Sequence, residues 1–420
     1  MCLTHLEDFA NMNEFMALDR NLKLRTLTTF IATLLSSSVL PNMTIYYTHY
    51  FGAAITGVLL IIVSVLGFVA GLYGGHLSDT YGRKPIMISG NAMMVGGFAL
   101  AAVVNSPLLV SPVATFVGFL VADIGGALAD PAQQAMMIDV STPKNRQFVF
   151  ALIYWVLNIG VMLGAAIGGW FFRDYLFELL LALVIGGLIN IAIIAWGMDE
   201  TLKKIVQTSG SVWSALKAYA AVLTDRRFMI FLMGYCTATI ITMQPNYYLA
   251  VHLGRDFTNV TIFGIQVYGQ RMLSLITLIN TVMIVFMMSI FTAIGRKMSL
   301  QREYAWGMSL QAVAFAAAFI LHTLWPLALC AVVLTVGEML TVPASQTLRA
   351  NLMNPASIGA YSGATSAVRP LSAVLAGALL TASTLIGPVG MAVSMLLLGI
   401  ATILLTNHSS RMRASFDNPA

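Results

Sequence analysis

One short polar stretch, Gly75-His76-Leu77-Ser78-Asp79-Thr80-Tyr81-Gly82-Arg83-Lys84, lies between two long apolar runs of the chain. Charged residues make up only 9% of the sequence, yet this stretch contains an acid, two strong bases and two glycines. Gly82 permits a tight turn with positive φ, and Gly75 allows two helices to approach closely. The stretch therefore predicts a polar turn that joins two apolar helices.

The composition independently indicates a membrane protein. Hydrophobic residues make up 58% of the 420 residues, and the mean hydropathy of +0.84 is too high for the surface of a water-soluble domain. A helix needs about 20 apolar residues to cross a bilayer, and backbone groups in lipid must bond internally. The apolar runs predict twelve spans, at 27–48, 53–75, 86–105, 112–138, 148–171, 177–196, 228–250, 270–293, 304–323, 326–347, 359–383 and 388–406.

Most lysines and arginines lie on one side of these spans, while only Arg173, Arg255 and Arg271 fall on the other. Cytoplasmic loops carry the excess of bases, so we expect a multi-pass plasma-membrane protein with both termini in the cytoplasm. The net charge of +5 then reflects topology and anionic headgroups, not nucleic acid. The bases assigned to the cytoplasmic side are Arg20, Lys23, Arg25, Arg83, Lys84, Lys144, Arg146, Lys203, Lys204, Lys217, Arg226, Arg227, Arg296, Lys297, Arg302, Arg349, Arg411 and Arg413.

The chain is expected to consist of two six-helix halves. The longest polar interruption has six spans on each side, and Gly295-Arg296-Lys297 repeats Gly82-Arg83-Lys84 at the matching place. A repeated motif supports an internal duplication, although a basic loop arising by chance is the alternative. The expected parts are a cytoplasmic segment without a cleaved signal peptide at 1–26, halves at 27–196 and 228–406, a central cytoplasmic loop at 197–227, and a cytoplasmic tail at 407–420.

The order G-x-L-x-D-x-x-G-R-K at residues 75–84 resembles the loop between spans 2 and 3 of the major facilitator superfamily. The resemblance implies an all-α integral membrane transporter with twelve transmembrane helices in two six-helix halves. In related transporters this loop helps to close the inner gate, and Arg83 is expected to reach Asp139 at the end of span 4. Simple topological anchoring is the alternative. The expected gating residues are Gly75, Asp79, Gly82, Arg83, Lys84 and Asp139.

Span 5 contains glycines spaced four apart, which favour close contact between helices. The run Gly160-Val161-Met162-Leu163-Gly164-Ala165-Ala166-Ile167-Gly168-Gly169 resembles a motif of antiporters in the superfamily, with Ala165 where that motif has proline. Ordinary small-residue packing is the alternative. The residues assigned to this motif are Gly160, Gly164, Gly168 and Gly169.

Acidic residues inside the predicted spans are the candidates for proton coupling. Glu338 lies in the middle of span 10, and Asp123 and Asp130 lie about two helical turns apart on span 4. An unpaired carboxylate in hydrocarbon costs several kcal/mol, so such a group is expected to be protonated, paired or in a wet cavity. Arg369 in span 11 is the expected counter-charge to one of them, and a purely structural ion pair is the alternative.

The predicted central cavity combines aromatic and amide side chains with polarisable methionines, which suits lipophilic molecules of varied shape. Clusters of bases are missing from the spans, which disfavours phosphate esters. His252 and His322 fall near the outer ends, where a satisfied interfacial histidine is expected. The predicted substrate-binding residues are Glu338, Tyr154, Trp155, Asn158, Gln244, Asn246 and Arg369.

From about residue 12 onward the chain is similar to drug:proton antiporters, in particular the multidrug exporters of lactic acid bacteria. Three acids of that family are missing, at Ile153, Asn246 and Gly399, and Asp123 and Asp130 are additions. The resemblance implies export of lipophilic, often cationic compounds in exchange for protons. It rests on Leu18-Asp19-Arg20-Asn21-Leu22, Met43-Thr44-Ile45-Tyr46-Tyr47, Ala54-Ile55-Thr56-Gly57, Gly82-Arg83-Lys84-Pro85, Tyr268-Gly269-Gln270-Arg271-Met272-Leu273 and Asn351-Leu352-Met353-Asn354-Pro355.

The leading hypothesis is therefore a proton-coupled exporter of lipophilic small molecules that acts as a monomer. A facilitator or symporter of a neutral metabolite on the same fold is one alternative, and a non-transporting membrane sensor is another. The sequence contains no catalytic constellation, metal cluster or P-loop, so we expect no enzyme activity, cofactor or ATP-driven pumping. Three cysteines, two of them inside spans, predict no disulfide framework.

Overall fold

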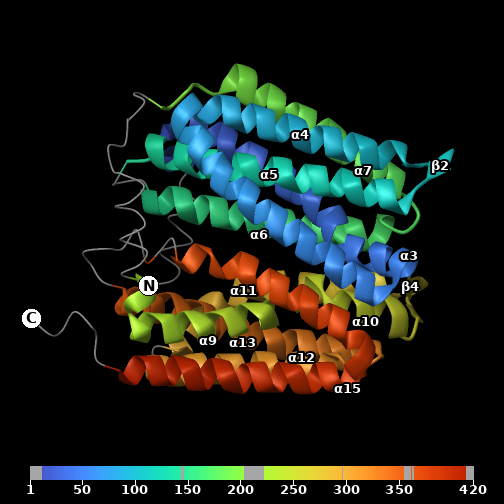
Figure 1. The fold of residues 1–420 in the computed structure, drawn as a ribbon, viewed down its shortest axis with the longest axis vertical. Helices are drawn as coiled ribbons and strands as arrows, with labels where there is room; N and C mark the ends of the chain where they lie inside the picture. Colours follow the sequence, from blue (N-terminus) through green and yellow to red (C-terminus); the bar gives the residue numbers. More distant parts are fainter. Residues whose placement is uncertain are drawn as a thin grey trace, which may run out of the picture. The chain divides into compact units, whose positions relative to one another are not determined.

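The computed structural model describes residues 12–142, 146–202, 222–295, 297–353, 361 and 364–412. These residues form mainly long helices (Figure 1), in agreement with the predicted all-α membrane fold. Several predicted features lie outside the described residues, namely the segment 1–11, most of the central loop, and the bases Lys144, Lys203, Lys204, Lys217, Arg296 and Arg413.

The chain divides into two compact units. The first comprises Met1–Tyr50 and Ile62–Val206, and the second comprises Phe51–Ile61 and Gln207–Ala420. The predicted halves differ from these units in one segment, because residues 51–61 belong to the second unit although the sequence assigns them to span 2 of the first half. This segment contacts α15, where Thr381 donates a hydrogen bond to the Ala54 carbonyl at 3.0 Å.

In the first unit, α4 packs against both α5 and α7. Figure 1 shows these helices side by side. The elements are α2 (Met12–Ala17), α3 (Arg20–Tyr81, shared with the second unit), α4 (Arg83–Val103), β1 (Asn105–Ser106), β2 (Leu109–Val110), α5 (Pro112–Val140), α6 (Arg146–Phe171), α7 (Leu176–Ala192) and the π-helix η1 (Ile193–Gly197).

In the second unit, α15 packs against α9 and α12, and α13 packs against α11 and α12. The elements are α9 (Arg226–Thr242), the 3₁₀ turn η2 (Gln244–Asn246), α10 (Tyr248–Asp256), β3 (Val260–Ile262), β4 (Ile265–Val267), α11 (Gly269–Gly295), α12 (Leu300–Ala318), α13 (Leu324–Leu352) and α15 (Val368–Arg411).

Eight helices of the described residues are long and apolar enough to cross a membrane. Two of them each contain two predicted spans, because α3 and α15 continue through a change of direction at a single glycine. Gly52 has φ +78° and Gly387 has φ +65°, a backbone conformation that other residues rarely adopt. Predicted span 7 is itself interrupted, since η2 separates α9 from α10.

Glycines allow the helices to approach closely. A Cβ atom added to Gly90 would lie 2.6 Å from the Gly125 carbonyl oxygen, and one added to Gly118 would lie 2.6 Å from that of Gly97. These positions hold α4 against α5 at two levels. Because lipid is as apolar as a leucine side chain, such close van der Waals packing is a main source of helix association in a membrane.

Two short antiparallel hairpins are the only strands in the described ranges, and the sequence did not predict them. One pairs Asn105 with Val110, and the other pairs Val260 with Val267. In the second hairpin Phe263 and Gly264 both have positive φ, which is the conformation of a tight hairpin turn. The strands of these hairpins are only two and three residues long, too short for the periodicity that identifies strands.

Candidate functional site

The turn between α3 and α4 consists of a single residue outside the helices, Gly82. Its φ of +102° is the positive value that the sequence predicts, and its N–H donates to the Ser78 carbonyl at 3.2 Å. A Cβ atom at this position would lie 2.6 Å from Oε2 of Glu200. Both the backbone conformation and the neighbouring carboxylate therefore require glycine here.

The Arg83 guanidinium joins the ends of three helices. Its Nη1 bonds to Asp79 and lies 3.0 Å from Ser78 Oγ, while its Nε lies 3.4 Å from Asp139 Oδ2 at the end of α5. The Arg83 side chain is only 12% exposed. The structure thus brings together Asp79, Arg83 and Asp139, the polar group that the sequence predicts.

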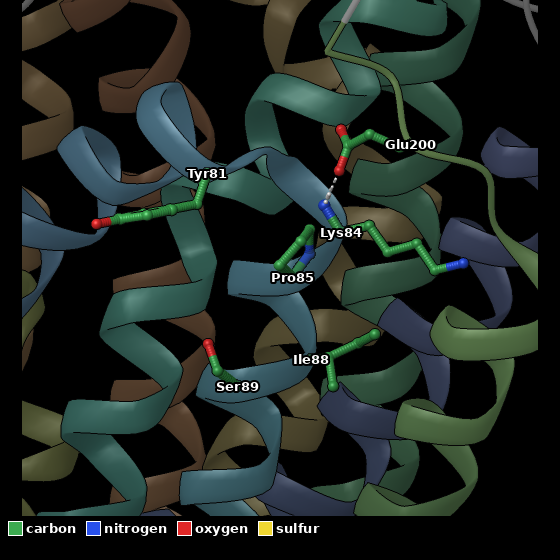
Figure 2. Close-up of a pocket in the computed structure, with 6 residues that line it drawn as sticks. All are labelled: Tyr81, Lys84, Pro85, Ile88, Ser89 and Glu200. Carbon is green, nitrogen blue, oxygen red and sulfur yellow. Dashed lines mark hydrogen bonds between the residues drawn. The ribbon is translucent and has the colours of Figure 1, made fainter. Parts of the chain in front are cut away.

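Glu200 completes this group, although sequence analysis assigned it no role. One of its oxygens accepts from the Arg83 N–H at 3.0 Å and the other from the Lys84 N–H at 2.9 Å, which Figure 2 shows in part. Helix N-termini leave such N–H groups without partners and attract negative charge. Burial would raise the pKa of Glu200, but these bonds and those from its own Thr201 and Leu202 N–H groups outweigh it and lower the pKa.

Thr201 connects the two acids, because its hydroxyl donates to Asp139 Oδ2 at 3.0 Å. We call Ser78, Asp79, Arg83, Asp139, Glu200 and Thr201 the gate cluster. It links the ends of α3, α5 and η1 with the start of α4. The only sequence signal for Glu200 and Thr201 was an acid just after span 6, in a stretch interpreted as polar linker.

Lys84 contributes to this group through its backbone. In Figure 2 its side chain extends away from the Glu200 carboxylate and to the side opposite Tyr81. A groove here is lined by Tyr81, Lys84, Pro85, Ile88, Ser89 and Glu200. The lysine ammonium therefore lies apart from the gate cluster, and the assignment of Lys84 as a gating residue stays a prediction.

Gly75 does not provide the close helix contact that the sequence predicts. A Cβ atom there would have its nearest neighbour, Pro131 Cβ, at an ordinary 3.8 Å. The preceding residue, Gly74, provides the contact instead, because its Cβ would lie 2.8 Å from Leu128 Cα. The prediction was wrong by one position, which on a helix is a rotation of about 100°.

In the second unit, the Glu338 carboxylate accepts a hydrogen bond from Asn280 Nδ2 at 2.6 Å. The same amide lies 3.2 Å from the Thr335 hydroxyl. Asn280 is a site residue that sequence analysis missed, although a lone amide in the middle of span 8 was a visible signal. An amide N–H donated to one carboxylate oxygen leaves the other free to bind a proton or a cation.

The two acids of α5 have different surroundings. Asp130 accepts from Gln134 Nε2 at 2.7 Å and lies within electrostatic range of Arg25 in α3. Within the first unit, Arg25 thus interacts electrostatically with Asp130, whereas the sequence offered Arg369 as the counter-charge to one of the acids in the spans. Asp123 is exposed and lies within electrostatic range of Tyr47. No ion pair within 4 Å joins Arg369 to Glu338, both of which the structure describes.

The residues predicted to bind substrate fall into two groups. Tyr154, Trp155 and Asn246 are exposed, so their side chains are accessible. Gln244 is fully buried and donates to the Ile240 carbonyl at 3.0 Å, and its role in substrate binding stays a prediction. Asn158 is half-buried and bonds to its own helix at the Tyr154 carbonyl.

The span 5 glycines lie against the first part of α3. A Cβ atom at Gly160 would lie 3.0 Å from Thr33, one at Gly164 would lie 2.8 Å from Ser37 Cβ, and one at Gly168 would lie 3.0 Å from Asn42 Nδ2. Gly169 follows on the same helix. The motif therefore forms a flat face for helix packing.

This arrangement of apolar helices and a charged interhelical turn defines a polytopic membrane transporter. The chain belongs to the Major Facilitator Superfamily, whose family description matches residues 26–377. The proteins of this family are transporters, and the chain is a transporter of this fold.

Relatives with assigned functions are distant. The chain is 28% identical over 363 residues to a Na(+), Li(+), K(+)/H(+) antiporter of Planococcus maritimus, covering 83% of this chain and 86% of the relative. It is 25% identical over 330 residues to the multidrug resistance protein MdtH of Proteus mirabilis (strain HI4320), covering 77% of each chain. A solved POT family transporter in complex with a thioalcohol conjugated peptide matches with a TM-score of 0.71 at 14% identity, covering 93% of this chain and 95% of that one. At that identity the structural match supports the fold alone.

Proposed function

We propose that the chain is a monomeric antiporter of the plasma membrane that exports lipophilic, cationic small molecules in exchange for protons, with both termini in the cytoplasm. The observation that carries the proposal is the Glu338–Asn280 pair in the second unit. A carboxyl group among apolar helices binds a proton readily, and its ionised form attracts a cationic substrate. Because one carboxyl group binds either a proton or the cationic substrate, binding of one releases the other, and the two are exchanged across the membrane.

The gate cluster is proposed to close the cytoplasmic side during each cycle. Arg83 bonds to acids from two helices, and Glu200 holds the first N–H groups of α4. A single charge-assisted hydrogen bond in contact with water contributes little free energy, but several such bonds in one network contribute more. The bonds of the gate cluster can therefore form in one state of the transporter and break in the other.

The names of the relatives support antiport and export. The Planococcus protein is named as a cation/proton antiporter, and MdtH as a multidrug resistance protein. The sequence resemblance to LmrP-type exporters of lactic acid bacteria points the same way. The missing acids at Ile153, Asn246 and Gly399 imply fewer protons or a narrower cargo range than in those exporters.

The proposal is tested with inside-out vesicles that are energised by a proton gradient. They are expected to accumulate a fluorescent lipophilic cation such as ethidium, and Glu338→Gln is expected to abolish this accumulation. Glu178→Gln makes the same chemical change at an exposed acid in the first turn of α7 and is expected to leave it intact. Accumulation that needs neither the gradient nor Glu338 would refute proton coupling through this residue.

A second candidate is exchange of an alkali-metal cation for protons. It is favoured by the name of the Planococcus relative and by the exposed carboxylate Asp123 in the first unit. Carboxylate and amide oxygens are suitable ligands for such hard cations. In the same vesicles, adding Na⁺, Li⁺ or K⁺ would then collapse the proton gradient, and Asp123→Asn would prevent the collapse. Transport of a neutral metabolite would show neither response.

A further inference from the structure

A buried histidine connects α10 to the segment between α12 and α13. His252 is 1% exposed, and its Nε2 lies 3.0 Å from the Leu321 carbonyl oxygen. Nearby, the Thr258 N–H donates to the His322 carbonyl at 2.8 Å. Two contacts thus fasten residues 252–258 to residues 321–322, and we call this contact the α10 joint.

The hydrogen bonds determine where the histidine proton lies. A carbonyl oxygen can only accept, so Nε2 must carry the proton in its bond to Leu321. In the neutral ring, Nδ1 is then an acceptor with a lone pair. Nδ1 is buried without a hydrogen bond and lies 3.3 Å from the Asp256 carboxylate. Two acceptors therefore face each other in the neutral joint, with no proton between them to form a hydrogen bond.

Charged and titratable groups come close to the His252–Asp256 pair from α10 itself, from His322 and from the start of α11, but not from α15. On α10, Arg255 Nε lies 3.6 Å from the other Asp256 oxygen, and the Tyr248 ring stacks at 6.0 Å from the imidazole. The His322 ring lies 5.1 Å away. On α11, Arg271 lies over the Tyr268 ring and donates to the Gln266 carbonyl. The part of α15 from residue 370 to 407 carries no titratable side chain.

We propose that His252 and Asp256 form a proton-binding site that controls the α10 joint, which the neutral imidazole holds closed and which protonation loosens. The geometry carries this proposal, because the closed joint buries the ring completely and leaves Nδ1 unbonded beside a carboxylate. The sequence predicted an interfacial histidine with all its hydrogen bonds made, but in the structure only Nε2 of His252 has a hydrogen bond.

The direction of the effect follows from linkage. Burial is the largest influence and lowers the pKa of His252, and His322 lowers it further; the Leu321 carbonyl and Asp256 oppose them without reversing the shift. The proton binds better when the ring is in water, where its pKa is about 6.5. The joint is thus fully stable above about pH 6.5 and weakens as the pH falls from there to the lowered pKa, below which the ring is protonated in both states.

Titration of the side chain by nitrogen NMR in lipid nanodiscs tests the proton site. At neutral pH, Nε2 is expected to be protonated and Nδ1 not, with a midpoint for Nδ1 below that of an ordinary histidine. Asp256→Asn removes the attracting charge and offers an N–H to Nδ1, so it should shift the midpoint further down. His322→Gln removes a repelling charge and should shift it up. A midpoint that neither variant moves would overturn the proposal.

Loosening of the joint needs a separate measurement. Spin labels at Asn259 and Trp325, in a chain whose native cysteines are replaced by serine, report the distance across the joint. The distance distribution is expected to broaden between pH 7.5 and pH 5. In His252→Gln, whose amide can still donate to Leu321 but does not titrate, it is expected to stay narrow. An equal response in both chains would contradict the proposal.

Neither measurement depends on transport. Dye accumulation that persists in Glu338→Gln would refute the proposed function, and a His252 midpoint that neither variant moves would refute the proton site, so the two failures are separate results and either can occur without the other.

Discussion

Glu200 shows how one side chain outside a helix can define where that helix begins. Gly82 offers no side chain to cap α4, and the first N–H groups of any helix lack intrahelical partners. Glu200 accepts from Arg83 and Lys84, and it also accepts from the N–H groups that follow it. One carboxylate therefore fixes both the start of α4 and the segment after η1.

Glu200→Gln is expected to lower the free energy of unfolding by about 1 kcal/mol, because a charge-assisted acceptor is replaced at an exposed site. The pKa of Glu200 is lowered in the folded state, so its contribution is present above the usual glutamate pKa and is lost as the pH falls through the lowered value. Thermal unfolding in detergent at pH 7 and at pH 3 checks this. Asp199→Asn is the control, since Asp199 bonds to Asn21 through its backbone.

Asp79→Asn is expected to reduce transport strongly while leaving the amount of folded protein unchanged. Asp79 is largely exposed, so the folded chain tolerates the loss of its charge. Arg83 then retains a salt bridge only to Asp139 at the end of α5. Dye accumulation and size-exclusion chromatography of the same preparations provide the test. Asp174→Asn, in the loop before α7, should behave as the wild type. A parallel loss of transport and folded protein in Asp79→Asn would assign the residue to stability.

At the scale of elements, glycine positions determine which helices touch. The crossing of α3 and α5 brings the Leu128 backbone against Gly74, while the neighbouring Gly75 has space beside it. The same kind of contact joins α12 to α13, where a Cβ atom at Gly337 would lie 2.6 Å from the Gly307 carbonyl oxygen. This second contact helps to hold the helix that carries Glu338.

Gly74→Ala and Gly75→Ala form a matched pair that tests the α3–α5 contact. The first places a methyl group against a rigid backbone and is expected to destabilise the protein by about 1–3 kcal/mol. The second adds the same methyl group at an ordinary contact distance of 3.8 Å from Pro131 Cβ, where replacing glycine in a helix is neutral or slightly stabilising. Melting temperatures in one detergent compare them. Equal effects would mean that the contact at Gly74 is not rigid.

The sequence predicted helices well and their contacts poorly. Apolar runs identify the spans because hydropathy acts residue by residue, and Gly82 was recognised because positive φ is a local property. Arg25, Asn280 and Glu200 were missed because their roles depend on partners far away in the chain. The one-residue error at Gly75 has a related cause, since sequence spacing does not give the rotation of a helix about its axis.

At the scale of the whole molecule, the distribution of bases determines the expected orientation. Lysines and arginines cluster at the termini and in alternate loops, which the positive-inside rule assigns to the cytoplasm. The two β-hairpins lie in the loops that carry few bases. Leu108 and Phe263 at their tips are 96% and 100% exposed. Apolar, fully exposed tips at the ends of spans are suited to contact with the lipid interface.

Cysteine labelling in intact cells tests this orientation. Leu108→Cys and Phe263→Cys are expected to react with a membrane-impermeant maleimide added outside, since both positions are exposed and lie in the predicted external loops. Tyr81→Cys, where the native side chain is 68% exposed beside the gate cluster, should react only after the membrane is made permeable. The reverse pattern would place the gate cluster and both termini outside the cell. The proposed direction of export would then be wrong. Since charge asymmetry alone predicts the result, the test also measures how far the bases govern the topology of this chain.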